Sequence, residues 1–253
     1  MNTSEYLLRI GIETAVNADA EGLKLLHRQH LLNVPFENLD IHWKRRIVLD
    51  TDEFFKKIVD ERRGGFCYEL NGLFNILLRE LGFRTRLVSA RVFGEQGFGP
   101  EFDHAAIIVT IGELEYLVDV GFGDFTYEPL RIVADIEQHD REGEFVIRRA
   151  EYGVLETAKM IEGVWIPQYK FSTLGRHLSE FAEMCDFQQY SPKSHFTKGV
   201  LCSILTETGR TTLTGTRLIV TGNGERTETA VESKRDFEKH LQKDFGIVPT
   251  LIT

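Results

Sequence analysis

One of the three cysteines of the chain stands where a helix would make it reactive. Cys67 lies in "RRGGFCYELN", after Gly64 and Gly65 and at the start of an apolar helical repeat. The first turn of a helix presents free backbone N–H groups and the positive end of the helix dipole, which favour a thiolate over a thiol. We therefore expect a lowered pKa at Cys67 and a nucleophile whose acyl adduct could use the same N–H groups as an oxyanion site. A plain core residue is the alternative, because free cysteines are often buried.

A histidine and an aspartate are spaced so that a hairpin would bring them together. Asp119 interrupts the apolar "YLVDVGF", and a buried carboxylate needs a partner. A two-residue turn at Gly112-Glu113 would place Asp119 opposite Ala106, with His104 on the same face and diagonal to Asp119. The pair is either a structural ion pair or, with Cys67, the base and orienting carboxylate of a triad, and we favour the triad. Metal-ligand spacings such as Cys-x-x-Cys or His-x-x-x-His do not occur, so we expect no metal site.

The elements that must position these residues change in type along the chain. Apolar spacing predicts helices over residues 3–11, 20–32 and 50–65, and a further helix from Cys67 that ends at Gly82. Short β-branched and aromatic segments predict strands at 85–93, 104–111, 114–122, 144–156 and 163–172, which indicates a barrel or a strongly curved sheet. The last part predicts a helix at 174–187, a hairpin around "TGNGE" and a helix at 233–246.

Composition excludes several classes of protein. The 253 residues carry a net charge of −9, which argues against a nucleic-acid partner. The sequence shows neither a signal peptide nor a stretch long enough to span a membrane, so no membrane association is expected. Three cysteines without paired spacing fit a reducing cytoplasm.

Five motifs in order carry a family resemblance. The segments "VPFENLD", "RRGGFCYELN", "HAAIIV", "YLVDVGFG" and "SPKSHFTKGVLCS" are similar to those of the arylamine N-acetyltransferase family. The resemblance implies an α+β fold with a cysteine-protease-like core: an N-terminal helical lobe at 1–84, a β-barrel lobe at 85–190 and a C-terminal α/β lid at 191–253. It also implies a cytoplasmic enzyme of xenobiotic metabolism. Such an enzyme transfers acetyl groups from acetyl-CoA to aromatic amines and hydrazines by a ping-pong mechanism through an acetyl-cysteine.

The resemblance also implies roles for individual residues. The nucleophile, base and orienting carboxylate would be Cys67, His104 and Asp119. The acceptor pocket would be bordered by Gly121, Phe122, Gly123 and Phe36, although a simple turn and core packing explain these residues as well. CoA would be met by Lys193 and Ser194, unless they form an exposed loop. A buried polar network that positions the nucleophile helix would contain Glu37, Arg63, Glu69 and Asn71.

Two other functions use the same residues. A cysteine hydrolase or amide synthase would employ the triad with another acyl donor, and a non-catalytic module would only bind aromatic amines. The sequence does not indicate the physiological acceptor, the choice among acetyl, propionyl and malonyl donors, or the oligomeric state. The tail "IVPTLIT" is short for the family, so the resemblance does not fix the orientation of bound CoA or the range of acceptors.

Overall fold

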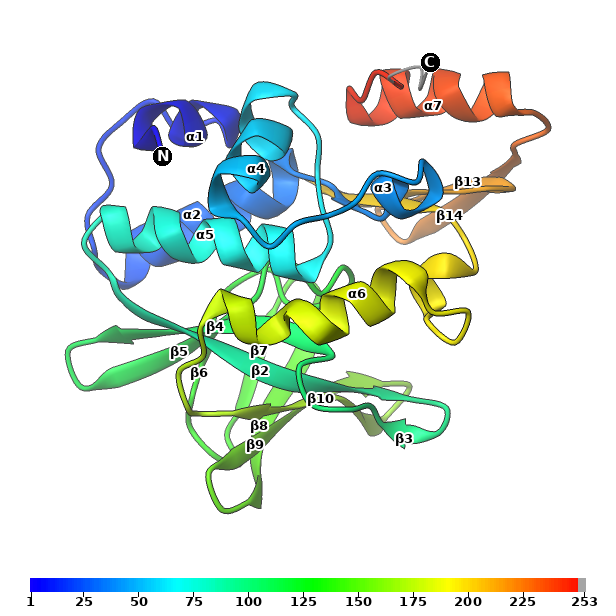
Figure 1. Ribbon diagram of the computed structural model, residues 1–253. Coiled ribbons are helices and arrows are strands. Elements are labelled where there is room, and N and C mark those ends of the chain that lie inside the picture. Colours follow the sequence, from blue (N-terminus) through cyan, green and yellow to red (C-terminus); the bar gives the residue numbers. More distant parts are fainter. Residues whose placement is uncertain (250–253) are drawn as a thin grey trace.

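Helices occupy the first part of the chain and the strands of a large sheet follow, as the sequence predicts (Figure 1). The computed structural model describes residues 1–249, so the last four residues of the tail "IVPTLIT" lie outside the described part. The helical segments are α1 (Thr3–Arg9), α2 (Ala20–Asn33), α3 (Leu39–His42), α4 (Thr51–Phe55), η1 (Lys56–Asp60), α5 (Cys67–Glu80), η2 (Leu178–Phe181), α6 (Ala182–Tyr190), η3 (His195–Thr197) and α7 (Lys234–Phe245).

Helix α5 is the central helix of the fold. It begins at Cys67, where the sequence predicts the first turn, and ends at Glu80. Its leucine and phenylalanine side chains recur every three or four residues and are fully buried, so burial of this face drives the helix to form. The buried apolar side chains on it are Leu70, Leu73, Phe74, Leu77 and Leu78.

The helix predicted over residues 50–65 is shorter and irregular. The Asp50 side chain caps α4 as expected and accepts a hydrogen bond from the Asp52 N–H at 2.8 Å. The chain then enters the π-helical turn η1, which ends at Asp60, before the two glycines. A π-turn is uncommon and often marks a functional region. Here Lys57, on this turn, reaches Glu69 of α5.

The strands form two antiparallel sheets. The larger has the order β6-β5-β4-β2-β10-β9-β8-β7, with β3 attached to β2, and the smaller has the order β1-β11-β12-β13-β14. The strand predicted at 114–122 ends at Val118, so Asp119 begins the following loop. The strands are β1 (Phe36–Glu37), β2 (Arg84–Gly94), β3 (Gly97–Phe98), β4 (His104–Ile111), β5 (Leu114–Val118), β6 (Leu130–Arg131), β7 (Glu137–Asp140), β8 (Gly143–Glu151), β9 (Val154–Ile161), β10 (Val164–Ser172), β11 (Leu201–Thr206), β12 (Gly209–Thr214), β13 (Arg217–Gly222) and β14 (Glu225–Ala230).

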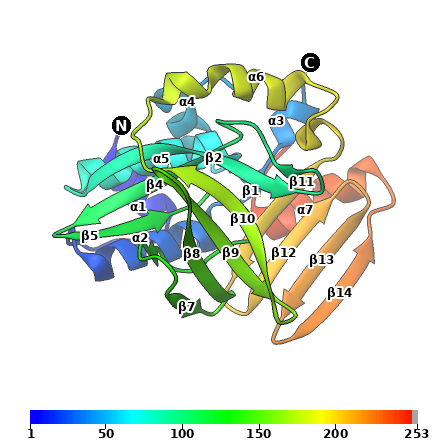
Figure 2. The ribbon, with the colours of Figure 1, turned by 90° about the horizontal axis from the view of Figure 1, so that it is seen from below.

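The large sheet curls until its two edges meet, which makes it nearly a barrel (Figure 2). The Gln138 side chain on β7 accepts a hydrogen bond from the Arg131 N–H of β6 at 2.8 Å and donates to the Arg131 carbonyl at 2.9 Å. An amide side chain thus substitutes for ladder hydrogen bonds and satisfies an edge strand. The predicted curved sheet is confirmed.

Long-range contacts join the first and last thirds of the chain. Strand β1 pairs with β11, so that Phe36 lies opposite Ser203. Phe181 and Cys185, from η2 and α6, belong to the same buried cluster as the apolar face of α5. The division into lobes at residues 84 and 190 stays a prediction. Over residues 1–249, the helices are too short or too polar for any of them to cross a bilayer.

Candidate active site

The two glycines before Cys67 let the chain pass close to its neighbours. A Cβ at Gly64 would lie 1.9 Å from the Pro35 carbonyl oxygen, and one at Gly65 would lie 2.8 Å from the Glu69 Cβ. Any larger residue would push the start of α5 away from β1. The Phe66 N–H donates to Glu69 Oε2 at 3.1 Å, which fixes the residue immediately before Cys67.

The hairpin formed by β4 and β5 has the register that the sequence predicts. Ile111 pairs with Leu114, and Gly112 adopts the positive φ of 60° that a two-residue turn with glycine first requires. His104 therefore lies diagonal to Asp119, and its Nε2 is 2.7 Å from Asp119 Oδ2. Both side chains are buried. With Nε2 engaged by the carboxylate, Nδ1 is the ring nitrogen left for another partner.

Three further donors converge on the Asp119 carboxylate. Asn71 Nδ2 donates to Oδ1 at 2.8 Å, the Gly121 N–H donates to the same oxygen at 3.0 Å, and the Tyr169 hydroxyl donates to Oδ2 at 2.9 Å. Burial by itself would raise the pKa of Asp119, but His104 and these hydrogen bonds outweigh it and hold the pKa below its usual range. The carboxylate is therefore ionised at neutral pH.

Asn71 also connects α5 to the strands beside it. Its Nδ2 donates to the Ala105 carbonyl at 2.7 Å, and its Oδ1 accepts from the Val120 N–H at 2.9 Å. The sequence predicts Asn71 in one network with Glu37, Arg63 and Glu69, but its contacts are instead with Ala105, Asp119 and Val120, on the side of α5 that faces the strands. These contacts reach the loop after β5.

The loop after Asp119 packs directly on the first turn of α5. A Cβ at Gly121 would lie 2.8 Å from Cys67 Cα and 2.7 Å from Asn71 Nδ2. The family resemblance implies that Gly121 borders the acceptor pocket. The close approach in the structure is to the backbone of Cys67 itself.

The electrostatic environment of Cys67 differs from the expected one. Cys67 is only 3% exposed, and burial raises the pKa of its thiol well above the usual range, while a hydrogen bond with the Ala105 backbone opposes the shift. The expected lowering of this pKa is not found: burial is the largest cause of the rise, and the nearby Asp103 and Asp119 carboxylates add to it. A thiolate here would need a cation beside it, and His104 stands at the start of β4, a strand that packs against α5.

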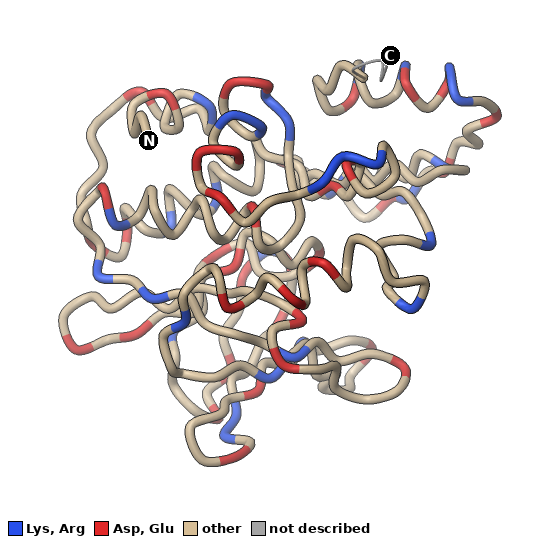
Figure 3. The backbone as a smooth tube through the Cα atoms, viewed as in Figure 1, with Lys and Arg blue, Asp and Glu red and all other residues tan. Residues whose placement is uncertain are grey.

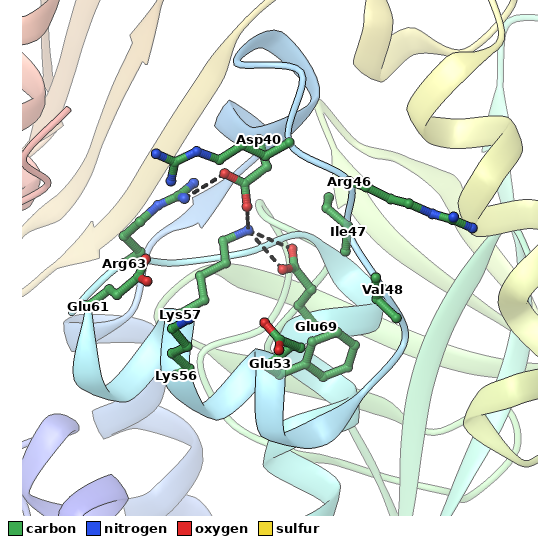
Figure 4. A pocket seen from close by; sticks show the side chains of 12 residues that line it. Asp40, Arg46, Ile47, Val48, Glu53, Lys56, Lys57, Glu61, Arg63 and Glu69 are labelled. Carbon is green, nitrogen blue, oxygen red and sulfur yellow. Dashed lines mark hydrogen bonds and ion pairs between the residues drawn. The ribbon is translucent and has the colours of Figure 1, made fainter. Parts of the chain in front are cut away.

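A network of buried charges supports the other side of α5 (Figure 4). Lys57 Nζ lies 2.8 Å from Glu69 Oε1 and 2.9 Å from Asp40 Oδ2. Arg63 lies 2.6 Å from Asp40 Oδ1 and 2.7 Å from Glu37 Oε1. The prediction that Glu37, Arg63 and Glu69 form a buried polar network is confirmed, and the structure adds Lys57 and Asp40 to it.

Three carboxylates share two cations in this network, so one negative charge is in excess. Burial raises the pKa of Glu69 to about 7, with the Glu37 and Asp40 carboxylates adding to the shift and Lys57 opposing it. Because Glu69 also accepts the Phe66 N–H, the residue least favoured as an anion is the one attached to the start of α5.

Aromatic rings surround the buried His104. The half-buried Phe122 ring packs edge-on against the imidazole with centroids 5.3 Å apart, and Tyr169 lies at the same centroid distance. Gly123 has a φ of +96° and open space around its Cα, as a turn requires. Phe36 is 8% exposed and packs near Phe196, in the core that includes α5. The predicted contacts of Phe36, Gly121, Phe122 and Gly123 with an acceptor stay predictions.

The two residues predicted to meet CoA have different surroundings. Lys193 is exposed, whereas Ser194 is 2% exposed and donates to Gln188 Oε1 at 2.6 Å. Gln188 in turn donates to Asp103 Oδ1 at 2.7 Å, next to His104 in the chain. The Ser194 side chain is therefore part of an internal polar chain, and a CoA contact by either residue stays a prediction.

Two buried residues near Asp119 were not predicted from the sequence. Tyr169 lies on β10, and only the pairing of β10 with β2 brings it near His104. His27 of α2 is fully buried, with Nε2 3.2 Å from the Asp119 carbonyl and Nδ1 3.0 Å from the Tyr127 carbonyl. The position of His27 on the apolar face of α2 was a usable signal, whereas nothing local marked Tyr169. Over residues 1–249 no group of His, Cys, Asp and Glu side chains is arranged to hold a metal ion.

Known proteins resemble this chain over nearly its whole length. A model of the N-acetyltransferase family matches residues 19–250. The chain is 33% identical over 249 residues to the arylamine N-acetyltransferase of Escherichia coli (strain K12), covering 96% of this chain and 88% of that protein. The solved arylamine N-acetyltransferase of Mycobacterium marinum in complex with CoA has a TM-score of 0.89 at 30% identity, covering 97% of this chain and 93% of that one. That of Bacillus cereus, described as having a Cys-His-Glu catalytic triad, has a TM-score of 0.90 at 26% identity, covering 98% of this chain and all of that one.

The family match defines the chain as an N-acetyltransferase. With full-length relatives above 30% identity, the chain belongs to the arylamine N-acetyltransferase family. The likeness of its structure to solved members also confirms the predicted α+β fold.

A side chain at Gly121 should disrupt the site. We expect Gly121→Ala to lower the free energy of unfolding by about 1–3 kcal/mol and to abolish most of the acetyltransferase activity, because its Cβ meets backbone of α5 that cannot yield. Urea denaturation and a turnover assay measure the two effects. Gly199→Ala is the matched control, since a Cβ there meets nothing within 4 Å and its φ is ordinary. Equal behaviour of the two variants would contradict the close-packing argument.

The raised pKa of Glu69 predicts a pH-dependent stability. A carboxyl group whose pKa rises from 4.5 to about 7 on folding stabilises the fold fully below pH 4.5, and this contribution is lost as the pH rises through 7. Glu69→Gln removes the titration, so the parent should lose on the order of 1–3 kcal/mol relative to the variant between pH 5 and 8. Denaturant titrations at several pH values test this. A difference between parent and variant that is the same at every pH would rule it out.

Proposed function

We propose that this enzyme transfers an acetyl group from acetyl-CoA to an aromatic amine or hydrazine through an acetyl-Cys67 intermediate. The observation that carries the proposal is the contact between His104 Nε2 and Asp119 Oδ2 at 2.7 Å, which leaves Nδ1 for the thiol at the start of α5. Membership of the arylamine N-acetyltransferase family supports the donor and the acceptor class, and a solved relative was obtained in complex with CoA.

The first half-reaction loads the cysteine. Asp119 holds His104 in one tautomer and stabilises the imidazolium, and His104 takes the proton of the Cys67 thiol. The thiolate attacks the thioester carbonyl carbon, a new C–S bond forms, and the bond from the acetyl carbon to the sulfur of CoA breaks. The imidazolium then returns its proton to the departing CoA thiolate. Backbone N–H groups in the first turn of α5 are the donors that would stabilise the oxyanion.

The second half-reaction transfers the acetyl group from Cys67 to the acceptor. The neutral amine nitrogen attacks the acetyl-cysteine carbonyl carbon, a C–N bond forms, and the Cys67 sulfur leaves. His104 accepts the proton that the nitrogen loses. Aromatic amines suit this step because their low basicity keeps them unprotonated and nucleophilic at neutral pH.

Substrate contacts follow from exposure and charge. The half-buried Phe122 ring beside His104 is the surface on which an aromatic acceptor would lie, with Gly123 providing the turn that presents it. The exposed Lys193 would meet a phosphate of CoA, and the buried Ser194 would hold that segment through Gln188. Phe36 contributes to the packing behind the nucleophile helix.

We assign the enzyme to the cytoplasm. All three cysteines are free thiols, and the mechanism requires one of them to stay reduced. A reducing compartment meets this need.

Intact-protein mass spectrometry tests the function directly. After mixing with acetyl-CoA alone, the protein should gain the mass of one acetyl group, and an arylamine should discharge it. Cys67→Ala should gain nothing, because the group that forms the thioester is missing. If the parent gains no acetyl group but turns over another thioester or an ester, the hydrolase or amide synthase function replaces this proposal.

A further inference from the structure

Strand β14 is an open edge of the smaller sheet. It pairs with β13 on one side, and no strand within residues 1–249 pairs with its other side. Figure 2 shows β14 as the outermost strand of this sheet. All six of its residues are exposed, whereas β1, at the opposite end of the sheet, has only two residues, both buried. The smaller sheet therefore has one long edge that solvent can reach.

The hydrogen bonds of the β13–β14 hairpin determine which backbone groups on this edge are free. The two-residue turn at 223–224 has a positive φ at both residues. The residues that flank such a turn form a hydrogen-bonded pair, and hydrogen-bonded pairs then alternate along the ladder. The first pair is Gly222 with Glu225, and the Val231 N–H donates to the Thr216 carbonyl at 2.9 Å in the same alternation. Every second residue of β14, counted from Glu225, therefore faces β13.

The remaining backbone groups of β14 form a row of free donors and acceptors. The N–H and C=O groups of Arg226, Glu228 and Ala230 point away from β13, and their side chains lie on one face of the sheet. Such a row is a template for another strand. Lysine and proline, which often protect an edge from such pairing, do not occur in β14. The charged side chains of Arg226 and Glu228 decide which strand can pair here.

These charges favour one way of pairing two copies of β14. Around a two-fold axis, the outward groups can meet in three antiparallel registers near the middle of the strand. Two of these registers place Arg226 opposite Arg226, or Glu228 opposite Glu228, and like charges directly opposite each other are destabilising. The third places Arg226 opposite Glu228, and the symmetry makes this contact twice. The strand is therefore complementary to itself in a single register.

We propose that β14 pairs with β14 of a second copy of this chain, so that the two smaller sheets become one continuous sheet. Arg226 of each copy lies opposite Glu228 of the other, and Thr227 lies opposite its own counterpart on the two-fold axis. Within one copy, Glu228 already accepts hydrogen bonds from Arg226 and, at 3.1 Å, from Arg217. In the dimer, each Glu228 carboxylate gains a further guanidinium as a partner.

The net charge of the protein does not oppose this contact locally. Strands β13 and β14 together carry two arginines, two glutamates and no other charged residue, so the edge is neutral. The acidic and basic positions of the chain are interspersed over the molecule rather than gathered on separate sides (Figure 3). Pairing over five residues covers much less than the roughly 800 Å² per partner of a standard interface. The dimer is therefore weak, reversible and dependent on protein concentration.

Sedimentation velocity of the full chain over a range of concentrations tests the dimer. The parent should show a reversible monomer–dimer equilibrium. Glu228→Arg and Arg226→Glu should each raise the dimer Kd by about tenfold or more, because each places like charges opposite each other. An equimolar mixture of these two variants should form a mixed dimer about as well as the parent does, because every cross-strand pair is then of opposite charge.

Arg235→Glu is the matched control for these charge reversals, since Arg235 is an exposed arginine on α7, away from the edge. Its dimer Kd should equal that of the parent. A parent that stays monomeric at every concentration would overturn the proposal. So would a mixture of Glu228→Arg and Arg226→Glu that does not recover dimerisation, or an equal loss in the control.

A disulfide tests the register. The two copies of Thr227 would form a non-hydrogen-bonded pair with Cα atoms about 4.5 Å apart, within the range that a disulfide spans. Thr227→Cys should therefore give a covalent dimer on mild oxidation, seen on a non-reducing gel. The three native cysteines are buried and should not interfere. Thr229→Cys is the control, because its counterpart would lie about 13 Å farther along the strand. Equal linking of both variants, or of neither, would refute this pairing.

Discussion

The buried carboxylate of Asp119 is the interaction on which the rest of the site depends. A charge enclosed in the interior is costly unless donors surround it, and here the donors come from β4, α5, β10 and the loop after β5. Each of these elements is therefore held in place by the same group. The helix that carries the thiol and the strand that carries the imidazole cannot separate without leaving a carboxylate unpaired.

The opposite side of α5 is supported in a different way. Around Asp119 a single charge meets neutral donors and one histidine, whereas behind the helix three carboxylates share Lys57 and Arg63. The Asp119 carboxylate stays ionised over the whole physiological pH range. The network behind the helix holds one excess negative charge away from water. The pKa of Glu69, which is attached to the start of α5, is therefore raised to about 7.

The sequence predicted those parts of the site that short-range rules control. The start of α5 and the β4–β5 register follow from glycines, a turn and a local repeat. Tyr169 could not be predicted, because its place beside His104 depends on the pairing of β10 with β2 some 80 residues away. The pKa of Cys67 was predicted with the wrong sign for a related reason. Local sequence shows the helix dipole, but burial is the result of the whole fold.

The short strand β1 connects the start of α5 with a late part of the chain. The Glu37 N–H donates to the Gly65 carbonyl at 2.8 Å, just before α5, and Glu37 lies opposite Cys202 of β11. The same residue holds Arg63 in the charged network behind the helix. A substitution in β11 that shifts β1 would therefore be felt at the first turn of α5, although β11 contributes none of the proposed triad residues.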